Sequence, residues 1–207
     1  METTVAEQIA VGMDIFEAIE TRRSTSKMTG QVPPRAAIER ILEAATWAPN
    51  HHVTEPWRFV VIAGAARETL GAVMATSKIE RRLAEGKVSP EGEFEALKRK
   101  ALRSPVIVAI AVEPGEATGN TELEEIEAGA AAAQNMLLTA HGLGLASMWR
   151  SGDAAFDPAV RAHLGFSERA TIIGFVYLGY PAAEATRSRH TPASEFTTWR
   201  GWDDNNG

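Results

Sequence analysis

The order of apolar and polar residues predicts short strands separated by longer helical segments. Four runs are rich in β-branched and aromatic residues and are bounded by turn-forming residues, as strands usually are. Because the first run, PWRFVVIAG, is almost continuously apolar, we expect it to be buried on both faces of a sheet. The predicted strands are residues 56–64, 105–112, 145–149 and 171–181.

The segments between these runs have the apolar spacing of amphipathic helices. In the first segment Asp14 is a suitable N-cap, and Ile15, Phe16 and Ile19 fall on one helical face. The second segment begins near Pro34, because proline is tolerated at the first position of a helix. The predicted helices are residues 14–21, 35–47, 66–87, 94–103, 122–141 and 157–166.

These elements predict an α+β fold of about four strands and five or six helices. No internal repeat or linker-like stretch divides the chain, so we expect a single domain over residues 1–207, with an N-terminal extension, 1–13, and a C-terminal arm, 182–207. The arm is too polar to fold alone, yet it carries Phe196, Trp199 and Trp202. Those aromatic side chains therefore need a surface to pack against.

Composition and charge argue against several classes of function. The net charge of −6 disfavours nucleic acids and anionic membranes, because both require a basic footprint. There is no cysteine, which excludes disulfides, thiol catalysis and cysteine-bound metals. The five histidines show no metal-binding spacing, and we expect no metal site. No basic residue precedes Arg22, so the N-terminus does not resemble a targeting signal, and we expect a cytoplasmic protein without a membrane span.

Two common nucleotide-binding motifs and one hydrolase motif are missing from the sequence. A Rossmann turn requires GxGxxG directly after a strand, whereas Gly142-Leu143-Gly144 follows a helix and precedes a strand. A Walker A loop is also absent. No GxSxG elbow exists, and Ser151 sits beside an arginine without the preceding glycine of that motif. Any nucleotide must therefore be bound in another way.

Two Arg-Ser pairs are the candidates for binding an anion. One lies in TRRSTSK, residues 21–27, at the end of the first helix, and the other in WRSG, residues 149–152. Either arginine could merely complement a helix dipole or follow a strand. Together, guanidinium groups, hydroxyls and exposed backbone N–H groups match a terminal phosphate monoester. The sequence alone leaves open whether the two pairs converge.

A third polar cluster, APNHHVTEPWRF, presents His51 and His52 between a helix and a strand, with Trp57 expected in the core. The three motifs in this order, RRS, then AP followed by a short loop and PWRF, then WRSG, resemble the nitroreductase family, and most closely its compact branch. The resemblance extends from about residue 14 to residue 196. It implies a central, mostly antiparallel sheet flanked by helices, and an obligate homodimer whose C-terminal arms wrap across the partner.

The resemblance also implies FMN as cofactor, NAD(P)H as reductant and a small-molecule electron acceptor. It places FMN at the subunit interface, with Trp47 and His51 reaching the flavin bound mainly by the partner. It assigns no catalytic acid or base, because the cofactor performs the difficult chemistry. The implied FMN residues are Arg22, Arg23, Ser24, Arg150, Ser151 and Gly152, and the implied NAD(P)H residues are Ala140, His141, Gly142, Leu143, Gly144 and Leu145.

The sequence departs from the family pattern at two positions. Many members have a basic residue where this chain has Ser26, and either Lys27 or Arg23 could replace it near the flavin ring. Many members have glutamine where this chain has Glu55, which bears on the choice of acceptor. Nothing in the sequence marks NADH over NADPH.

Two alternatives to a nitroreductase-like activity follow from the same motifs. A specialised flavin reaction, such as dehalogenation, azoline oxidation or flavin fragmentation, would need a lid, for which residues 77–103 are the candidate. A non-catalytic protein that binds FMN or another phosphorylated ligand would retain it without oxidising NAD(P)H. We expect instead that hydride passes from NAD(P)H through flavin N5 to nitroaromatics, quinones or similar acceptors, with ping-pong kinetics.

Overall fold

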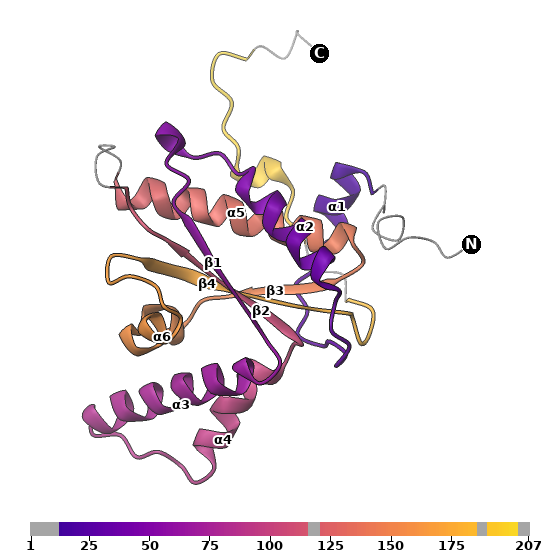
Figure 1. The fold of residues 1–207 in the computed structure, drawn as a ribbon. Helices are drawn as coiled ribbons and strands as arrows, with labels where there is room; N and C mark the ends of the chain where they lie inside the picture. Colours follow the sequence, from indigo (N-terminus) through magenta and orange to yellow (C-terminus); the bar gives the residue numbers. More distant parts are fainter. Residues whose placement is uncertain (1–12, 116–120, 186–189, 203–207) are drawn as a thin grey trace.

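Four strands form one antiparallel sheet in the order β1-β2-β4-β3 (Figure 1). The structure, a computed structural model, describes residues 13–115, 121–185 and 190–202. The predicted four-strand antiparallel sheet flanked by helices is confirmed; three strands lie within their expected segments, and β3 extends one residue beyond its segment, to Arg150. The strands are β1 (Trp57–Ala63), β2 (Val106–Val112), β3 (Ala146–Arg150) and β4 (Thr171–Gly179).

The central and edge strands differ in burial. All seven residues of β2 are buried, as expected for a strand with neighbours on both sides and helices on both faces. The prediction that β1 is buried on both faces was wrong. Trp57 and Ile62 are buried, whereas Arg58 and Val61 are exposed. The reason is that β1 is an edge strand, paired with β2 alone, and its outer side is only partly covered.

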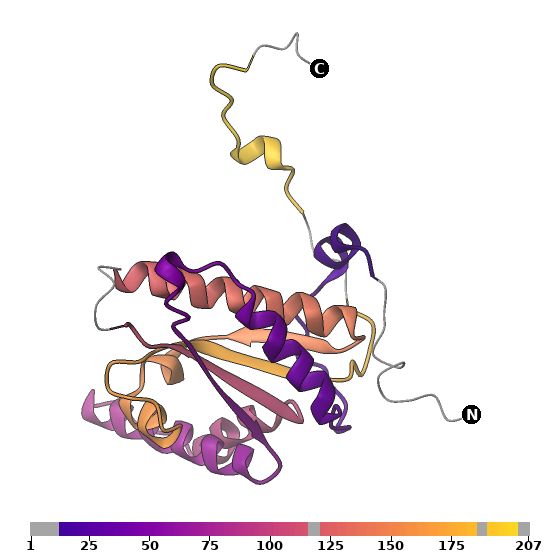
Figure 2. The ribbon, with the colours of Figure 1, turned by 45° about the horizontal axis from the view of Figure 1, so that its top comes forward.

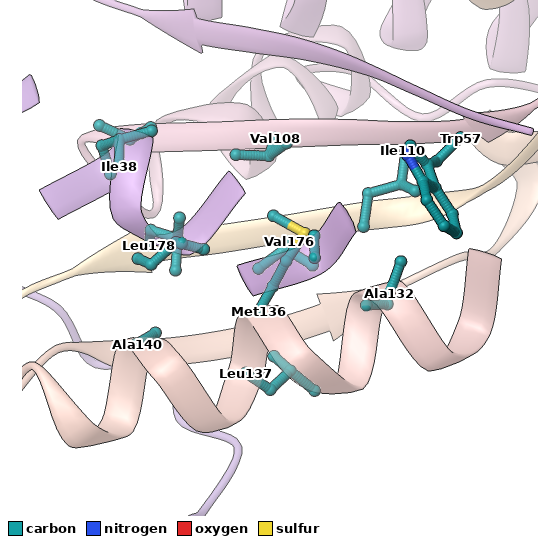
Figure 3. Packing of buried hydrophobic residues seen from close by; sticks show 14 of the residues in the cluster. Ile38, Trp57, Val108, Ile110, Ala132, Met136, Leu137, Ala140, Val176 and Leu178 are labelled. Carbon is teal, nitrogen blue, oxygen red and sulfur yellow. The ribbon is translucent and has the colours of Figure 1, made fainter. Parts of the chain in front are cut away.

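Helices α2 (Arg35–Thr46) and α5 (Glu122–Gly142) cover one face of the sheet (Figures 1 and 3). Both were predicted within one residue. Met136 of α5 lies against Val176 of β4 in the centre of this core, and Ile38 of α2 closes it from the side (Figure 3). At Gly129 of α5 an added Cβ would lie 2.5 Å from Val112, so the absence of a side chain lets this helix approach the sheet.

The opposite face is covered by α3 (Ala66–Ala84), α4 (Glu93–Lys98), η3 (Arg99–Leu102) and α6 (Pro158–His163) (Figure 1). The single helix predicted for residues 94–103 is instead divided into α4 and η3. Leu97 and Ala101 are buried beneath them, so the segment is packed against the domain and is not an open lid. Asp157 caps α6 by accepting backbone N–H groups, as its position before Pro158 predicts.

Two segments show more apolar surface than the sequence pattern leads one to expect. Helix α1 (Ile15–Thr21) is capped by Asp14 as predicted, but its apolar residues Ile15, Phe16 and Ile19 are exposed. Residues 190–202, which include η5 (Ala193–Phe196), extend away from the sheet and helices (Figure 2). Their three large aromatic side chains are also exposed, although the rings of Trp199 and Trp202 contact each other in a tilted arrangement, with centroids 5.6 Å apart.

No helix in the part of the chain that the structure describes is long and apolar enough to cross a membrane.

Candidate functional site

The RRS motif lies beside β3, the strand that ends at Arg150. Ser24 forms a parallel bridge with Ser147, and the Thr25 N–H donates to the Ser147 carbonyl over 3.1 Å. Arg150 lies three positions after Ser147, which is about 10 Å along a strand. The fold therefore brings the two Arg-Ser pairs to the same edge of the sheet, which the sequence could not establish.

The two adjacent arginines of this motif have different surroundings. Arg23 donates through Nη1 to the carbonyl oxygens of Glu20, at 2.6 Å, and Arg22, at 2.8 Å, at the C-terminal end of α1. Its guanidinium thus hydrogen-bonds backbone carbonyl groups at the C-terminal end of the helix, where a cation is favoured. The side chain of Arg22 makes only a long contact of 3.5 Å with Ser24 Oγ among the described residues. Arg22 is therefore the freer of the two to bind a ligand.

Arg150, Ser151 and Gly152 line a hollow of about 270 Å³ between the end of β3 and the helices of the second face, here called the Arg150 hollow. Arg150 pairs in register with Phe175, so its side chain projects on the same side of the sheet as α3. Gly152 has a φ of 77°, a conformation that favours glycine, and it turns the chain into η4 (Asp153–Phe156). The other polar lining residues are Lys78, Arg81, Lys100, Asp153, Asp157 and Tyr177.

The charges in the Arg150 hollow are unevenly paired. Asp153 accepts from both Lys78, at 3.1 Å, and Arg81, at 2.7 Å. The hydrogen bond and charge of Lys78, followed by Arg81, hold the pKa of Asp153 below its ordinary value. Lys100 and Arg150 form no ion pair or side-chain hydrogen bond with any described residue. The hollow therefore contains two cations without a counterion.

Tyr177 lies at the apolar wall of this hollow. Burial raises the pKa of its phenol, although the nearby charges of Arg150 and Arg103 oppose that effect. The phenol is therefore a neutral group at ordinary pH. No histidine is among the residues that line the hollow, and both of its carboxylates already bind other groups, Asp153 the Lys78 and Arg81 side chains and Asp157 the Ser77 hydroxyl and the start of α6. This arrangement fits anion binding better than nucleophilic catalysis.

The turn at residues 140–145 lies next to the RRS motif but is partly buried. The side chains of Ala140 and Leu145 belong to the core of the first face. Gly144, with a φ of 71°, allows the tight turn in which the Leu145 N–H donates to the Ala140 carbonyl. Of the six residues assigned to NAD(P)H by the resemblance, Ala140 is fully buried, whereas His141, Gly144 and Leu145 line a hollow beside this turn.

His141 links this turn to α1. Its Nε2 lies 2.8 Å from Thr21 Oγ1, and Thr21 donates its hydroxyl proton to the Glu17 carbonyl. The ring nitrogen must therefore be the donor in the first contact. Partial burial, followed by the charges of Arg22 and Arg23, lowers the pKa of His141, with Glu17 opposing. A hollow formed by this turn also includes Arg23 and Thr25.

Trp47 and His51 lie on the opposite side of the molecule's apolar core from the Arg150 hollow. Trp47 caps the C-terminus of α2 and is 79% exposed, and His51 begins η2 (His51–Val53), stacked against His52 at 4.1 Å. Within one protomer neither residue lines the Arg150 hollow. Their assignment to the partner's flavin is compatible with this exposure.

The loop that carries His51 is held in a strained conformation. His52, Val53 and Glu55 all have positive φ values, which are unfavourable for residues with a side chain. Two hydrogen bonds stabilise the loop: Thr54 Oγ1 donates to Glu125 at 3.0 Å, and the Glu55 N–H donates to Asn50 Oδ1 at 3.0 Å. Glu125 is almost fully buried in α5, a position that helical periodicity alone does not mark as functional.

Comparisons with known proteins agree with the motif-based resemblance. A model of the nitroreductase family matches residues 19–180. The chain is 31% identical over 180 residues to "Putative NAD(P)H nitroreductase YdjA" of Escherichia coli K12, spanning 87% of this chain and 95% of that protein. A nitroreductase-like family protein of Bacillus cereus superposes with a TM-score of 0.77 at 24% identity, over 98% of this chain and 100% of the other. A protein of Desulfovibrio desulfuricans, described as "a putative nitroreductase in complex with fmn", superposes with a TM-score of 0.68 at 25% identity, over 91% and 97% of the two chains.

Proposed function

We propose, from the premise that this chain belongs to the nitroreductase family, that it is an FMN-dependent oxidoreductase. It would take hydride from NADH or NADPH and reduce electron-poor small molecules such as nitroaromatics and quinones. The observation that carries this proposal is the placement of the RRS motif beside β3, whose end carries Arg150, Ser151 and Gly152. One edge of the sheet thereby gathers two of the three motifs on which the resemblance rests.

The residues at this edge suit a flavin nucleotide in their chemistry. Arg22 and Arg150 both have guanidinium groups without an ion-pair partner among the described residues. Ser24 and Ser151 add hydroxyls, and Gly152 leaves its backbone approachable, since a Cβ built there would meet nothing within 4 Å. Such a set can neutralise a phosphate and satisfy its several acceptor oxygens. FMN would also need an apolar, flat surface, which one protomer offers only in part.

A second copy of the chain is the proposed source of that missing surface. We define the α1 surface as the exposed apolar residues Ile15, Phe16, Ile19 and Trp47. Ile15 and Trp47 line one shallow groove together with residues of α5, so the surface is continuous across α1 and α2. Large apolar patches of this kind on a folded protein mark interaction sites. We propose a homodimer in which the α1 surface is buried, FMN lies at the interface, and the arm of each chain packs on its partner.

The chain's own residues would bind and orient the reactants without an acid or base of their own. Arg22, Ser24 and Arg150 would hold the phosphate and ribityl end, and His51 of the other copy would approach the ring. When bound, FMN supplies the ring that accepts hydride at N5 and delivers it to the second substrate. Because nicotinamide and acceptor would occupy the same place in turn, the expected kinetics are ping-pong.

The test begins with the purified protein and added FMN. We expect a yellow protein with flavin absorbance and stoichiometric FMN binding, and steady oxidation of NADH or NADPH when a quinone or nitroaromatic is present. A protein that gains no flavin absorbance would refute the proposal. One that binds FMN tightly but oxidises neither nucleotide would instead be a non-catalytic FMN-binding protein.

A further inference from the structure

The Arg150 hollow contains more positive charge than the phosphate assignment above uses. Four basic side chains line it, against two carboxylates. Both carboxylates already have partners: Asp153 binds Lys78 and Arg81, and Asp157 caps α6 and accepts the Ser77 hydroxyl. The excess charge is therefore that of Arg150 and Lys100, and no motif in the sequence points to Lys100.

Lys100 is held at the hollow by its backbone. It belongs to η3, whose next residue, Ala101, is fully buried, and Leu97 in the turn before it is also buried. Partial burial and then the charges of Lys78, Arg103 and Arg150 lower the pKa of Lys100, and only Asp153 opposes them. Like charges that face one hollow repel each other, and an anion bound between them would remove that cost.

The size of the hollow limits what it can hold. Its volume of about 270 Å³ is slightly below the roughly 300–1,000 Å³ of most sites for drug-sized ligands. Its apolar lining includes Met74, Leu97 and Phe175, and the four basic side chains belong to the same lining. A whole flavin nucleotide would not fit, but the charged end of a ligand or a small acidic molecule would.

We propose that Lys100 and Arg150, assisted by the Ser151 hydroxyl, bind an oxyanion carried by a small molecule, either a phosphate or a carboxylate. A guanidinium group from β3 and an ammonium group from η3 that line one hollow supply several donors to the oxygens of such an anion. This inference rests on the proposed function, since it assumes a flavin enzyme. The oxyanion can come from two sources: the phosphate of FMN itself, or the acidic group of the electron acceptor.

The experiment compares Lys100→Met with Arg99→Met in the full-length protein. Arg99 is the neighbouring residue on η3, is exposed and does not line the hollow, so its replacement changes the net charge equally. Each protein is freed of flavin and titrated with FMN and with riboflavin, which lacks the phosphate. If the FMN phosphate occupies the hollow, Lys100→Met should weaken FMN binding by about tenfold to a hundredfold and leave riboflavin binding unchanged.

The second source is tested with holoenzyme at saturating FMN and two nitroaromatic acceptors, para-nitrobenzoate and the uncharged para-nitrobenzyl alcohol. If the acceptor's carboxylate occupies the hollow, Lys100→Met should raise the KM for the benzoate by about tenfold or more without altering that for the alcohol. Lys100→Arg, which keeps the charge, should retain most of the binding in either case.

Equal behaviour of Lys100→Met, Arg99→Met and the unmodified protein in both arms would overturn the inference, even with FMN bound and NAD(P)H oxidised. Failure of the unmodified protein to bind FMN would instead refute the proposed function. A folded state of each variant is confirmed by circular dichroism and by its melting temperature, so a loss of binding can be separated from a loss of structure.

Discussion

The Arg150 hollow lies between elements of a single protomer, whereas the α1 surface faces solvent. The backbone around the hollow belongs to β3, α3 and η3. Its positive charge is not fully compensated, because Arg150 and Lys100 have no counterion among the described residues. On the α1 surface what is unsatisfied is apolar area, with Phe16 71% exposed and Trp47 79% exposed.

These two deficits call for different partners. The two uncompensated charges in a hollow of this size can be neutralised by one anionic group of a small molecule, because a few directed hydrogen bonds to that group are enough. An apolar surface formed by two helices is satisfied only by another apolar surface of similar extent. The comparison therefore separates ligand binding, which one protomer can begin, from association, for which a second copy is the proposed partner.

The largest effect on FMN binding is expected when the arginines of both motifs, Arg22 of RRS and Arg150 of WRSG, are replaced. Replacing Arg22 and Arg150 together by methionine removes two charge-assisted contacts, each worth about 1.5–3 kcal/mol. The FMN dissociation constant should rise by about a hundredfold or more, as measured by quenching of flavin fluorescence.

The matched control for this double change is Arg35→Met with Arg99→Met, which removes the same charge at exposed positions outside both motifs; the Arg35 side chain is 92% exposed. The control should bind FMN normally. If the double variant of Arg22 and Arg150 kept its FMN, neither motif would contact the phosphate, and the charge in the hollow would serve another ligand.

The second effect tests the α1 surface. Phe16→Glu places a charge in the proposed interface of both copies, and losing the burial of two phenylalanine side chains alone costs roughly 3–6 kcal/mol. The dissociation constant of the dimer should rise by about a hundredfold or more, as measured by analytical ultracentrifugation over a range of concentrations. FMN binding should weaken in parallel, because the interface would be incomplete.

Val88→Glu is the control for the interface, since Val88 is an exposed apolar residue in the loop between α3 and α4, on the other side of the sheet. It should leave the dimer intact. A Phe16→Glu protein that stayed dimeric would show that the α1 surface has another use.

Much of the fold, but less of the site, could be predicted from the sequence. Strand β2 and helix α2 follow directly from their apolar patterns, because local periodicity reports which side faces a core. The burial of β1 was mispredicted, because an edge position depends on strand order, which periodicity does not encode. The apolar face of α1 was recognised, but a pattern cannot say whether a face meets its own chain or a partner.

The residues of the site also divide into those that a local motif reveals and those that only the folded structure brings together. Arg22 and Arg150 were found because each lies in a short motif with a serine beside it. Lys100 was missed, because it reads as one more charge in KRKALR and becomes distinctive only where η3 meets the end of β3. Glu125 was missed too, since its contact with Thr54 joins residues 71 positions apart. Convergence over such separations depends on packing, and no motif records it.

The smallest effect concerns His141, which lies in the last turn of α5 and contacts Thr21 of α1, the helix that carries most of the α1 surface. Its pKa in the folded protein lies below the ordinary value of 6.5, so the folded state favours the neutral ring. Between the folded and unfolded pKa values the unfolded chain binds more protons, and the free energy of unfolding therefore decreases as the pH falls below about 6.5.

We expect the melting temperature to decline modestly between pH 7.5 and pH 5.5, and the decline is small because solvent screens this partly exposed ring. The decline should be smaller in His141→Gln, because the amide can still donate to Thr21 but does not titrate. His163→Gln serves as the control for the loss of one histidine, since His163 lies in α6 and not at the contact with α1. Equal slopes for the unmodified protein and His141→Gln would mean that the neutral ring contributes nothing to the attachment of α1.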